Sequence, residues 1–389
     1  MVYKISKMFK DFLENKKSGG IILIICTAVS ILIANSGFGE GYIHFWHMVI
    51  GFDKGGIGLN FPVEFWINDG LMVIFFLLVG LEIERELYVG ELSEVKNAML
   101  PVFAAAGGML IPALFHFILN NGTVTQSGIG IPMATDIAFA LGVLSLLGNK
   151  VPLSLKIFLT ALAIIDDLGA IIVIALFYTK GFSLIYLILS ISVFLLLLVL
   201  RKMKVMNLIF YILPGILMWY FMLKSGIHPT ITGVLLAFAI PFNNTKGESP
   251  SVKLEHSLIK PVSFIVLPLF ALANTGIIFS AGWYNEIFSS NSLGIIAGLS
   301  LGKPAGILFF SFIAIKSGLG NLPSDLNFRH IAGAGILAGI GFTMSIFITL
   351  LAFEDASLIV NSKLAVLLAS LISGITGYVY LKLIVNRKA

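Results

Sequence analysis

Five charged side chains lie within long apolar runs of the chain, and they are the first candidates for chemistry. They are Asp69, Asp136, Asp166, Asp167 and Lys303. A carboxylate or an ammonium group in the hydrocarbon core of a membrane is costly, so such residues mark an ion path or a buried ion pair.

Asp166 and Asp167 are neighbours near the middle of the apolar run 153–178. Successive residues of a helix are about 100° apart, so both side chains can border one cavity. The simpler alternative is that one aspartate pairs with Lys303 and only holds two helices together. One lysine neutralises one carboxylate, however, and an additional buried carboxylate is expected to hold a proton or a cation. The sequence therefore favours a proton and cation site here.

The composition agrees with a membrane setting. Of the 389 residues, 58% are hydrophobic and 12% are charged, whereas soluble domains have about 25% charged residues. The lone cysteine, Cys26, excludes an internal disulfide framework and a thiolate zinc cluster. A net charge of +5 does not indicate nucleic acid, because the basic residues fall in short groups between apolar runs rather than on one soluble face. We expect neither a nucleic-acid partner nor a cofactor.

The apolar runs predict an all-α integral membrane protein with about twelve transmembrane helices, since a span needs about 20 apolar residues. Two of the runs, 207–222 and 227–241, are shorter than the others. The predicted spans are 19–35, 63–81, 97–119, 129–147, 153–178, 183–200, 207–222, 227–241, 258–280, 293–315, 329–352 and 361–384.

The basic residues predict the orientation of these spans. Of the 25 Lys and Arg residues, 20 lie on the side shared by both termini, four lie on the opposite side and Lys303 lies within a span. Cytoplasmic loops carry the excess of basic residues, so both termini are expected in the cytoplasm. We predict one polytopic domain over 1–389, in which 1–17 is an amphipathic cytoplasmic lead-in. A cleaved signal peptide is the alternative, but no convincing small-x-small cleavage site follows the run 21–34.

Two spans contain residues that interrupt a helix. Glycine and proline precede Asp136 in the segment 130–136 of the fourth span, and glycines recur through 333–343 of the eleventh. Paired interruptions in corresponding halves indicate a transporter site on inverted repeats, here spans 3–5 (97–178) and 10–12 (293–384). Glycine-mediated helix packing is the alternative for the eleventh span. In the tenth span, Gly298, Gly302 and Gly306 are predicted to be packing residues.

At this point the chain resembles a known family, the bacterial Na⁺/H⁺ antiporters of the NhaA type. The resemblance extends from about Phe9 to the C-terminus. Its strongest matches, in chain order, are Phe65–Gly70, Phe75–Glu82, Pro132–Ala140, Ala163–Asp167, Leu301–Pro304 and Gly341–Ile348.

The resemblance implies an inverted-repeat fold of twelve helices in which unwound stretches of spans four and eleven cross. It implies that Asp136 offsets two facing helix N-termini and that Lys303 offsets two facing C-termini. Asp166 and Asp167 would bind the transported cation, Na⁺, and the proton, and Thr135 would line that site. Such charges suit the dipoles of helix ends, which are positive at the N-terminus and negative at the C-terminus.

Further residues are assigned to the ion path and to pH response. Asp69, near the external end of the second span, is a candidate for the cation path, with local hydrogen bonding as the alternative. The pH-response candidates implied by the resemblance, in a cytoplasmic funnel, are Glu82, Arg85, Glu86, Glu255 and His256. The chain departs from the family at Pro229 and Ile259, where alanine and histidine are expected, and these departures concern the pH profile.

The hypothesis is a secondary transporter of a bacterial inner membrane, not an enzyme. It exchanges cytoplasmic Na⁺ or Li⁺ for external protons by alternating access, electrogenically if more than one proton moves per Na⁺, for sodium export and pH homeostasis. Its partners are these ions and membrane lipid, with a homodimer left open. One alternative is a sodium-coupled symporter of an organic solute on the same fold. The other is an intramembrane aspartyl protease, whose Gly-x-Gly-Asp signature is absent around the three central aspartates.

Overall fold

The computed structural model describes residues 2–54, 57–178, 181–242, 249–279 and 282–386. The chain forms two compact units: unit 1 comprises 1–22, 86–173 and 279–389, and unit 2 comprises 23–85 and 174–278. The single membrane domain stays a prediction. The side chains of 1–17 lie outside the described residues, and with them the predicted amphipathic character of that segment.

Unit 1 holds most of the helices that follow the first quarter of the chain, and its inner faces are lined by small and aliphatic residues. Helix α1, Val2–Ala34, begins in unit 1 and continues in unit 2. The further elements of unit 1 are η2 Glu91–Ser93, α5 Val95–Asn120, η3 Gln126–Met133, α6 Ile137–Ser145, η4 Gly148–Lys150, α7 Leu153–Phe177, α13 Trp283–Glu286, α14 Ser290–Ala297, η6 Gly298–Gly302, α15 Lys303–Lys316, α16 Phe328–Ala338, α17 Phe342–Ala352 and α18 Ala356–Asn386. The last residues of α7 belong to unit 2.

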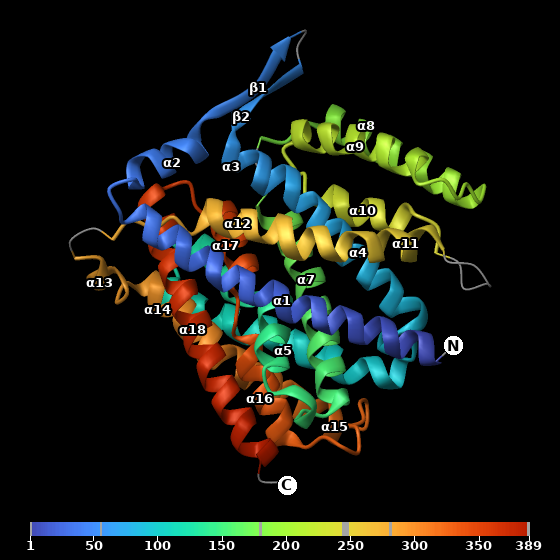
Figure 1. Ribbon diagram of the computed structural model, residues 1–389, viewed down its shortest axis with the longest axis vertical. Helices are drawn as coiled ribbons and strands as arrows, with labels where there is room; N and C mark the ends of the chain where they lie inside the picture. The colour runs from blue at the N-terminus through green and yellow to red at the C-terminus, as the bar shows by residue number, and fades with distance from the viewer. Residues whose placement is uncertain (1, 55–56, 179–180, 243–248, 280–281, 387–389) are drawn as a thin grey trace. The chain divides into compact units, whose positions relative to one another are not determined.

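Unit 2 combines helices with a short antiparallel ribbon, β1 Val49–Lys54 and β2 Ile57–Pro62, in which Val49 pairs with Pro62. The ribbon projects beyond the helices of its own unit, and α8 and α9 lie side by side (Figure 1). The helical elements are α2 Gly39–His47, α3 Val63–Phe65, η1 Trp66–Leu71, α4 Met72–Val89, α8 Leu184–Lys202, α9 Ile209–Ser225, α10 Ile231–Ala239, α11 Pro250–Pro261, η5 Val262–Val266 and α12 Leu267–Asn274. The last residues of α4 belong to unit 1.

The predicted spans coincide with helices, and the all-α membrane fold class is confirmed. Among the described residues, eight helices are long and apolar enough to cross a membrane, or up to ten if two bent pairs each count as one span. The two short predicted spans correspond to α9, with 17 residues, and α10, with nine. The number twelve therefore stays a prediction.

No span is predicted for the segment 36–62, which lies between the first two predicted spans. It contains α2, where Trp46 is 8% exposed, followed by β1 and β2. The strands follow from the β-branched and aromatic residues Val49, Ile50, Phe52 and Phe61, which favour pleated backbone. This local signal is present in the sequence, although no strand is predicted from it.

Both predicted interruptions are present in unit 1. The first falls at 134–136, between η3 and α6, and the second at 339–341, where α16 and α17 are bent by 48°. The glycines at 333 and 335 lie inside α16, so only the later part of the predicted segment is broken.

The glycines predicted to pack in the tenth span do so. A methyl group built on Gly306 would lie 2.0 Å from the carbonyl oxygen of Gly107, and one on Gly107 would lie 2.2 Å from that of Gly306. Nearby, a methyl on Gly298 would meet Pro132 and one on Gly302 would meet Pro112. Residues without side chains therefore allow α5 and α15 to approach to backbone contact.

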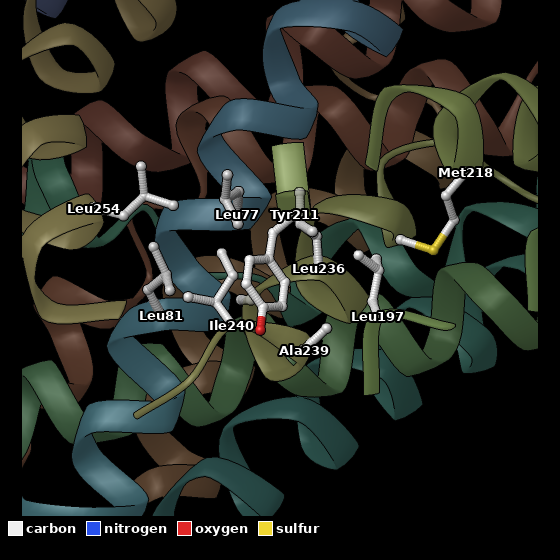
Figure 2. Close-up of a cluster of buried hydrophobic side chains, with 10 residues drawn as sticks. Leu77, Leu81, Leu197, Tyr211, Met218, Leu236, Ala239, Ile240 and Leu254 are labelled. Atoms are coloured by element: carbon white, nitrogen blue, oxygen red, sulfur yellow. The ribbon is translucent and has the colours of Figure 1, made fainter. Parts of the chain in front are cut away.

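Unit 2 has its own apolar core, which Figure 2 shows. Tyr211 of α9 is fully buried among aliphatic side chains of α4, α8, α10 and α11. Its hydroxyl reaches the carbonyl oxygen of Val205 at 3.0 Å, so its one polar atom is satisfied. The cluster fixes the helices that carry the charged residues of unit 2.

We expect Gly306→Ala to lower the free energy of unfolding by about 1–3 kcal/mol, because the added methyl meets backbone that cannot turn away. Thermal unfolding in detergent measures this change. Gly41→Ala is the matched control, since nothing lies within 4 Å of its added methyl. Equal unfolding midpoints for the two variants would contradict the packing described for α5 and α15.

Candidate functional site

The two central aspartates lie on the uninterrupted helix α7, whose apolar sequence keeps them in the interior of unit 1. Asp166 is 0% exposed and Asp167 is 1% exposed. Both predicted site residues are therefore buried, and the surroundings must compensate their charge.

Lys303 supplies an opposite charge. It is the first residue of α15, directly after the π-helical turn η6, and it is 0% exposed. Its Nζ lies 2.9 Å from Asp166 Oδ2 and also donates to the carbonyl oxygen of Met133, at the end of η3. Asp167 also acts electrostatically on Lys303. One ammonium group thus faces a carboxylate, a second nearby acid and the carbonyl end of an interrupted span.

Thr135, in the first interruption, connects this pair to the second interruption. Its Oγ1 lies 2.7 Å from Asp166 Oδ2 and 3.0 Å from the carbonyl oxygen of Ala338, the last residue of α16. A hydroxyl has one hydrogen to donate, so it serves one of these two acceptors at a time.

Asp136 binds the first residues of two helices. It is the N-cap of α6, where Oδ1 accepts from the amide of Phe139 at 2.9 Å. Oδ2 accepts from the amide of Thr343 at 3.1 Å and from its hydroxyl at 2.6 Å, at the start of α17. The amide of Asp136 donates to the carbonyl oxygen of Ile340 at 2.7 Å. A carboxylate at two helix N-termini is the arrangement that the dipoles favour.

The structure thus brings Thr135, Asp136, Asp166 and Lys303 together within unit 1, with Asp167 adjacent on α7. Two contributors were missed as site residues. Thr343 binds Asp136, and Ser345 donates to the carbonyl oxygen of Ile131 at 2.7 Å. Their signal was available, since Thr343 and Ser345 lie two and four residues after Gly341, the last glycine of the second interruption.

The other candidates, apart from Glu86, belong to unit 2. Asp69 lies in the π-helical turn η1 and pairs with His228, Nε2 to Oδ1, at 3.0 Å. The ring of Trp219 donates to the carbonyl oxygen of Asp69 at 2.8 Å. These contacts fit the alternative that Asp69 serves only for local hydrogen bonding. The place of Asp69 on a cation path stays a prediction.

The pH-response candidates of unit 2 form part of a charged cluster at the end of α4. Arg85 Nε lies 2.9 Å from Glu255 Oε1, and Glu82 is buried, whereas His256 is exposed. Beside them is an ion pair that the sequence analysis missed, Glu84 with Arg201 at 3.1 Å. Glu84 also accepts from the hydroxyl of Ser251 at 2.8 Å. These contacts join α4, α8 and α11, but the role in pH response stays a prediction.

Among the described residues, no group of three or more His, Cys, Asp or Glu side chains could hold a metal ion. The oxygens gathered around Asp166 and Asp167 are instead hydroxyl, carboxylate and backbone carbonyl groups. Such hard oxygen ligands suit a small cation that binds and leaves. That no cofactor is needed stays a prediction.

A buried acid pair and a lysine beside two interrupted apolar spans define the chain as an ion-coupled membrane transporter. Comparison with known proteins specifies which kind. Residues 10–381 match the family model described as Na⁺/H⁺ antiporter 1, and the chain belongs to this family, so it is a bacterial membrane protein. The resemblance noted from the sequence is confirmed.

Individual relatives match over nearly the whole chain. The Na(+)/H(+) antiporter NhaA 1 of Flavobacterium johnsoniae is 58% identical over 383 residues, which are 98% of each chain. The Na(+)/H(+) antiporter NhaA of Dechloromonas aromatica is 58% identical over 97% of this chain and 96% of the relative. That of Flavobacterium psychrophilum is 56% identical over 98% of each chain.

The ion pair at the centre of the site should show strong coupling in unfolding. We expect Lys303→Gln to lower the free energy of unfolding by about 3–5 kcal/mol, because it leaves the Asp166 carboxylate buried without its cationic partner. Adding Asp166→Asn to that variant should recover much of the lost stability. Thermal unfolding of the two single variants and the double variant measures the coupling, and simply additive losses would show that the pair does not form.

Glu91 of η2, outside the spans, should make the stability of the protein depend on pH. Burial raises the pKa of its carboxyl above the usual range, and the charges of Glu86 and Glu94 raise it further. Folding therefore favours the protonated acid, so this stability is present at acid pH and is lost as the pH rises through the raised pKa. We expect the unfolding midpoint of the wild type to fall relative to that of Glu91→Gln as the pH rises above the usual range of a glutamate carboxyl. A difference between the two unfolding midpoints that does not change with pH would contradict the prediction.

Proposed function

We propose that the protein exchanges cytoplasmic Na⁺ or Li⁺ for external protons. The observation that carries the proposal is the buried pair Asp166 and Lys303 with a second acid, Asp167, adjacent to it. The names of the relatives at 55–58% identity support the same exchange.

The proposed mechanism follows from charge compensation. Because Nζ of Lys303 contacts Oδ2 of Asp166, a cation that binds this oxygen must displace the ammonium group. Protons compete with the cation for Asp167 and Asp166, so the site holds one or the other. Thr135 would add its hydroxyl oxygen to the cation once its hydrogen turns toward Ala338.

We propose that the residues that bind the ends of the interrupted helices also offset the partial charges of those helix ends. Asp136 offsets the N-termini of α6 and α17, and Lys303 offsets the carbonyl end of η3. We further propose that the two interruptions belong to inverted repeats, spans 3–5 and 10–12, whose relative movement exposes the site to one side at a time.

The setting is proposed to be the inner membrane, with both termini in the cytoplasm, as the distribution of Lys and Arg predicts. If more than one proton moves per Na⁺, each cycle moves net charge and gains about 2.3 kcal/mol per charge per 100 mV. The proposed role is sodium export and pH homeostasis, with Glu82, Arg85, Glu86, Glu255 and His256 as the pH-response residues. Membrane lipid and a second copy of the chain are proposed partners.

We expect Asp167→Asn to abolish exchange while the protein stays folded, because the amide can neither release a proton nor neutralise a cation. Proteoliposomes with an acidic interior, loaded with a pH-sensitive dye, report exchange when Na⁺, Li⁺ or K⁺ is added outside. Asp325→Asn is the control, since Asp325 is exposed, and it should exchange normally.

Full activity in Asp167→Asn would refute the proposed site. Folded wild-type protein that shows no response to Na⁺ or Li⁺ between about pH 6 and pH 9 would refute the exchange itself. In that case, accumulation of a labelled organic solute with Na⁺ would be the next measurement.

A further inference from the structure

Two serines of α18 lie against the second interruption. Ser370 Oγ accepts from the amide of Phe342, the first residue of α17, at 3.1 Å. One turn further along α18, Ser373 lies beside Gly339, where a methyl group built on the glycine would be 2.6 Å from its hydroxyl oxygen. Both serines are buried, at 3% and 1% exposed. Neither was singled out by the sequence.

Ser370 completes the cap of α17. The first amides of a helix have no partner within the helix, and Gly341, the N-cap residue, has no side chain to supply one. Asp136 accepts from the amide of Thr343, and Ser370 accepts from that of Phe342. The start of α17 is therefore held from two sides, by an acid of the proposed site and by a hydroxyl of α18.

Ser373 is different, because its hydroxyl has no hydrogen-bond partner among the described residues. Buried polar groups nearly always have a hydrogen-bond partner, so a buried hydroxyl without one needs an explanation. Gly339 directly follows α16, and the carbonyl groups of Ile336 and Leu337 accept from amides of the interruption, those of Gly339 and Ile340. In the conformation described, the hydroxyl oxygen of Thr135 lies 3.0 Å from the carbonyl oxygen of Ala338.

We propose that Ser370 and Ser373 are positioning residues of the transport cycle, which rests on the exchange function proposed above. Ser370 holds the start of α17 in the conformation described. Ser373 donates to a carbonyl group at the end of α16 when the interruption rearranges. A site that opens to alternate sides needs at least two arrangements, and backbone groups freed in an apolar interior must find a partner in each.

The test compares four variants in proteoliposomes. We expect Ser370→Ala to lower the maximal exchange rate about tenfold, and Ser370→Thr, which keeps the hydroxyl, to restore most of it. Ser373→Ala removes no hydrogen bond of the described conformation, so its unfolding midpoint and half-saturating Na⁺ concentration should match the wild type. Its maximal rate should nevertheless fall about tenfold, because the second conformation loses its donor.

Ser362→Ala is the matched control for loss of a buried serine. Ser362 is on the same helix and accepts from the side chain of Asn291 at 2.7 Å, away from the interruption. This variant should lose stability and keep its maximal rate. Wild-type rates in both Ser370→Ala and Ser373→Ala, or no rescue by Ser370→Thr, would overturn the positioning roles.

Hydrogen exchange of the Phe342 amide separates this inference from the proposed function. Ser370→Ala should speed exchange at this amide about tenfold relative to the wild type, whether or not the protein transports Na⁺. An unchanged hydrogen-exchange rate at the Phe342 amide would overturn the role of Ser370. Faster hydrogen exchange at this amide in Ser370→Ala, together with a protein that does not transport Na⁺, would instead support the cap and refute the antiport function.

Discussion

Backbone groups freed where a helix breaks inside an apolar interior must find partners from the protein, and the rest of unit 1 depends on this constraint. The two interruptions satisfy each other in part. The amide of Asp136 donates to the carbonyl oxygen of Ile340, Thr135 reaches that of Ala338 and Ser345 reaches that of Ile131. Side chains next to each interruption thus hold the other one in place.

The same constraint determines where charge is placed. A carboxylate at the N-termini of α6 and α17 and an ammonium group at the carbonyl end of η3 each complement the partial charge of a helix end. Because Lys303 also contacts Asp166, the residue that compensates the broken backbone is also the partner of a buried acid. In the proposed exchange, movement of the interruptions and occupancy of the site are therefore coupled.

Local backbone geometry supports these positions. Lys303 directly follows the π-helical turn η6, and Asp69 lies in another, η1. A π-helical turn rotates the residues beyond it relative to a regular helix, and such turns are frequent at functional sites. In unit 2 the apolar cluster around Tyr211 fixes the helices that carry the ion pairs of Arg85 with Glu255 and of Glu84 with Arg201.

The sequence by itself determined the membrane class, the positions of the helices, the family and the acids that carry the proposed chemistry. It did so because hydropathy, helix-breaking glycine and proline, and charges in apolar runs are local properties. It also placed the interruptions near Asp136 and within 333–343. It did not reveal the β1–β2 ribbon, although β-branched and aromatic residues were present, because a span-by-span reading treats such a segment as a loop.

Only the tertiary structure decided which charges meet. The pairing of Asp166 with Lys303, the pairing of Asp69 with His228, and the capping of α17 by Asp136 and Ser370 all join residues distant in the chain. Neighbouring carboxylates differ by about 100° around a helix, and sequence does not say which direction the packed helices present to each other. Packing sets that rotation, so it alone selects the partners.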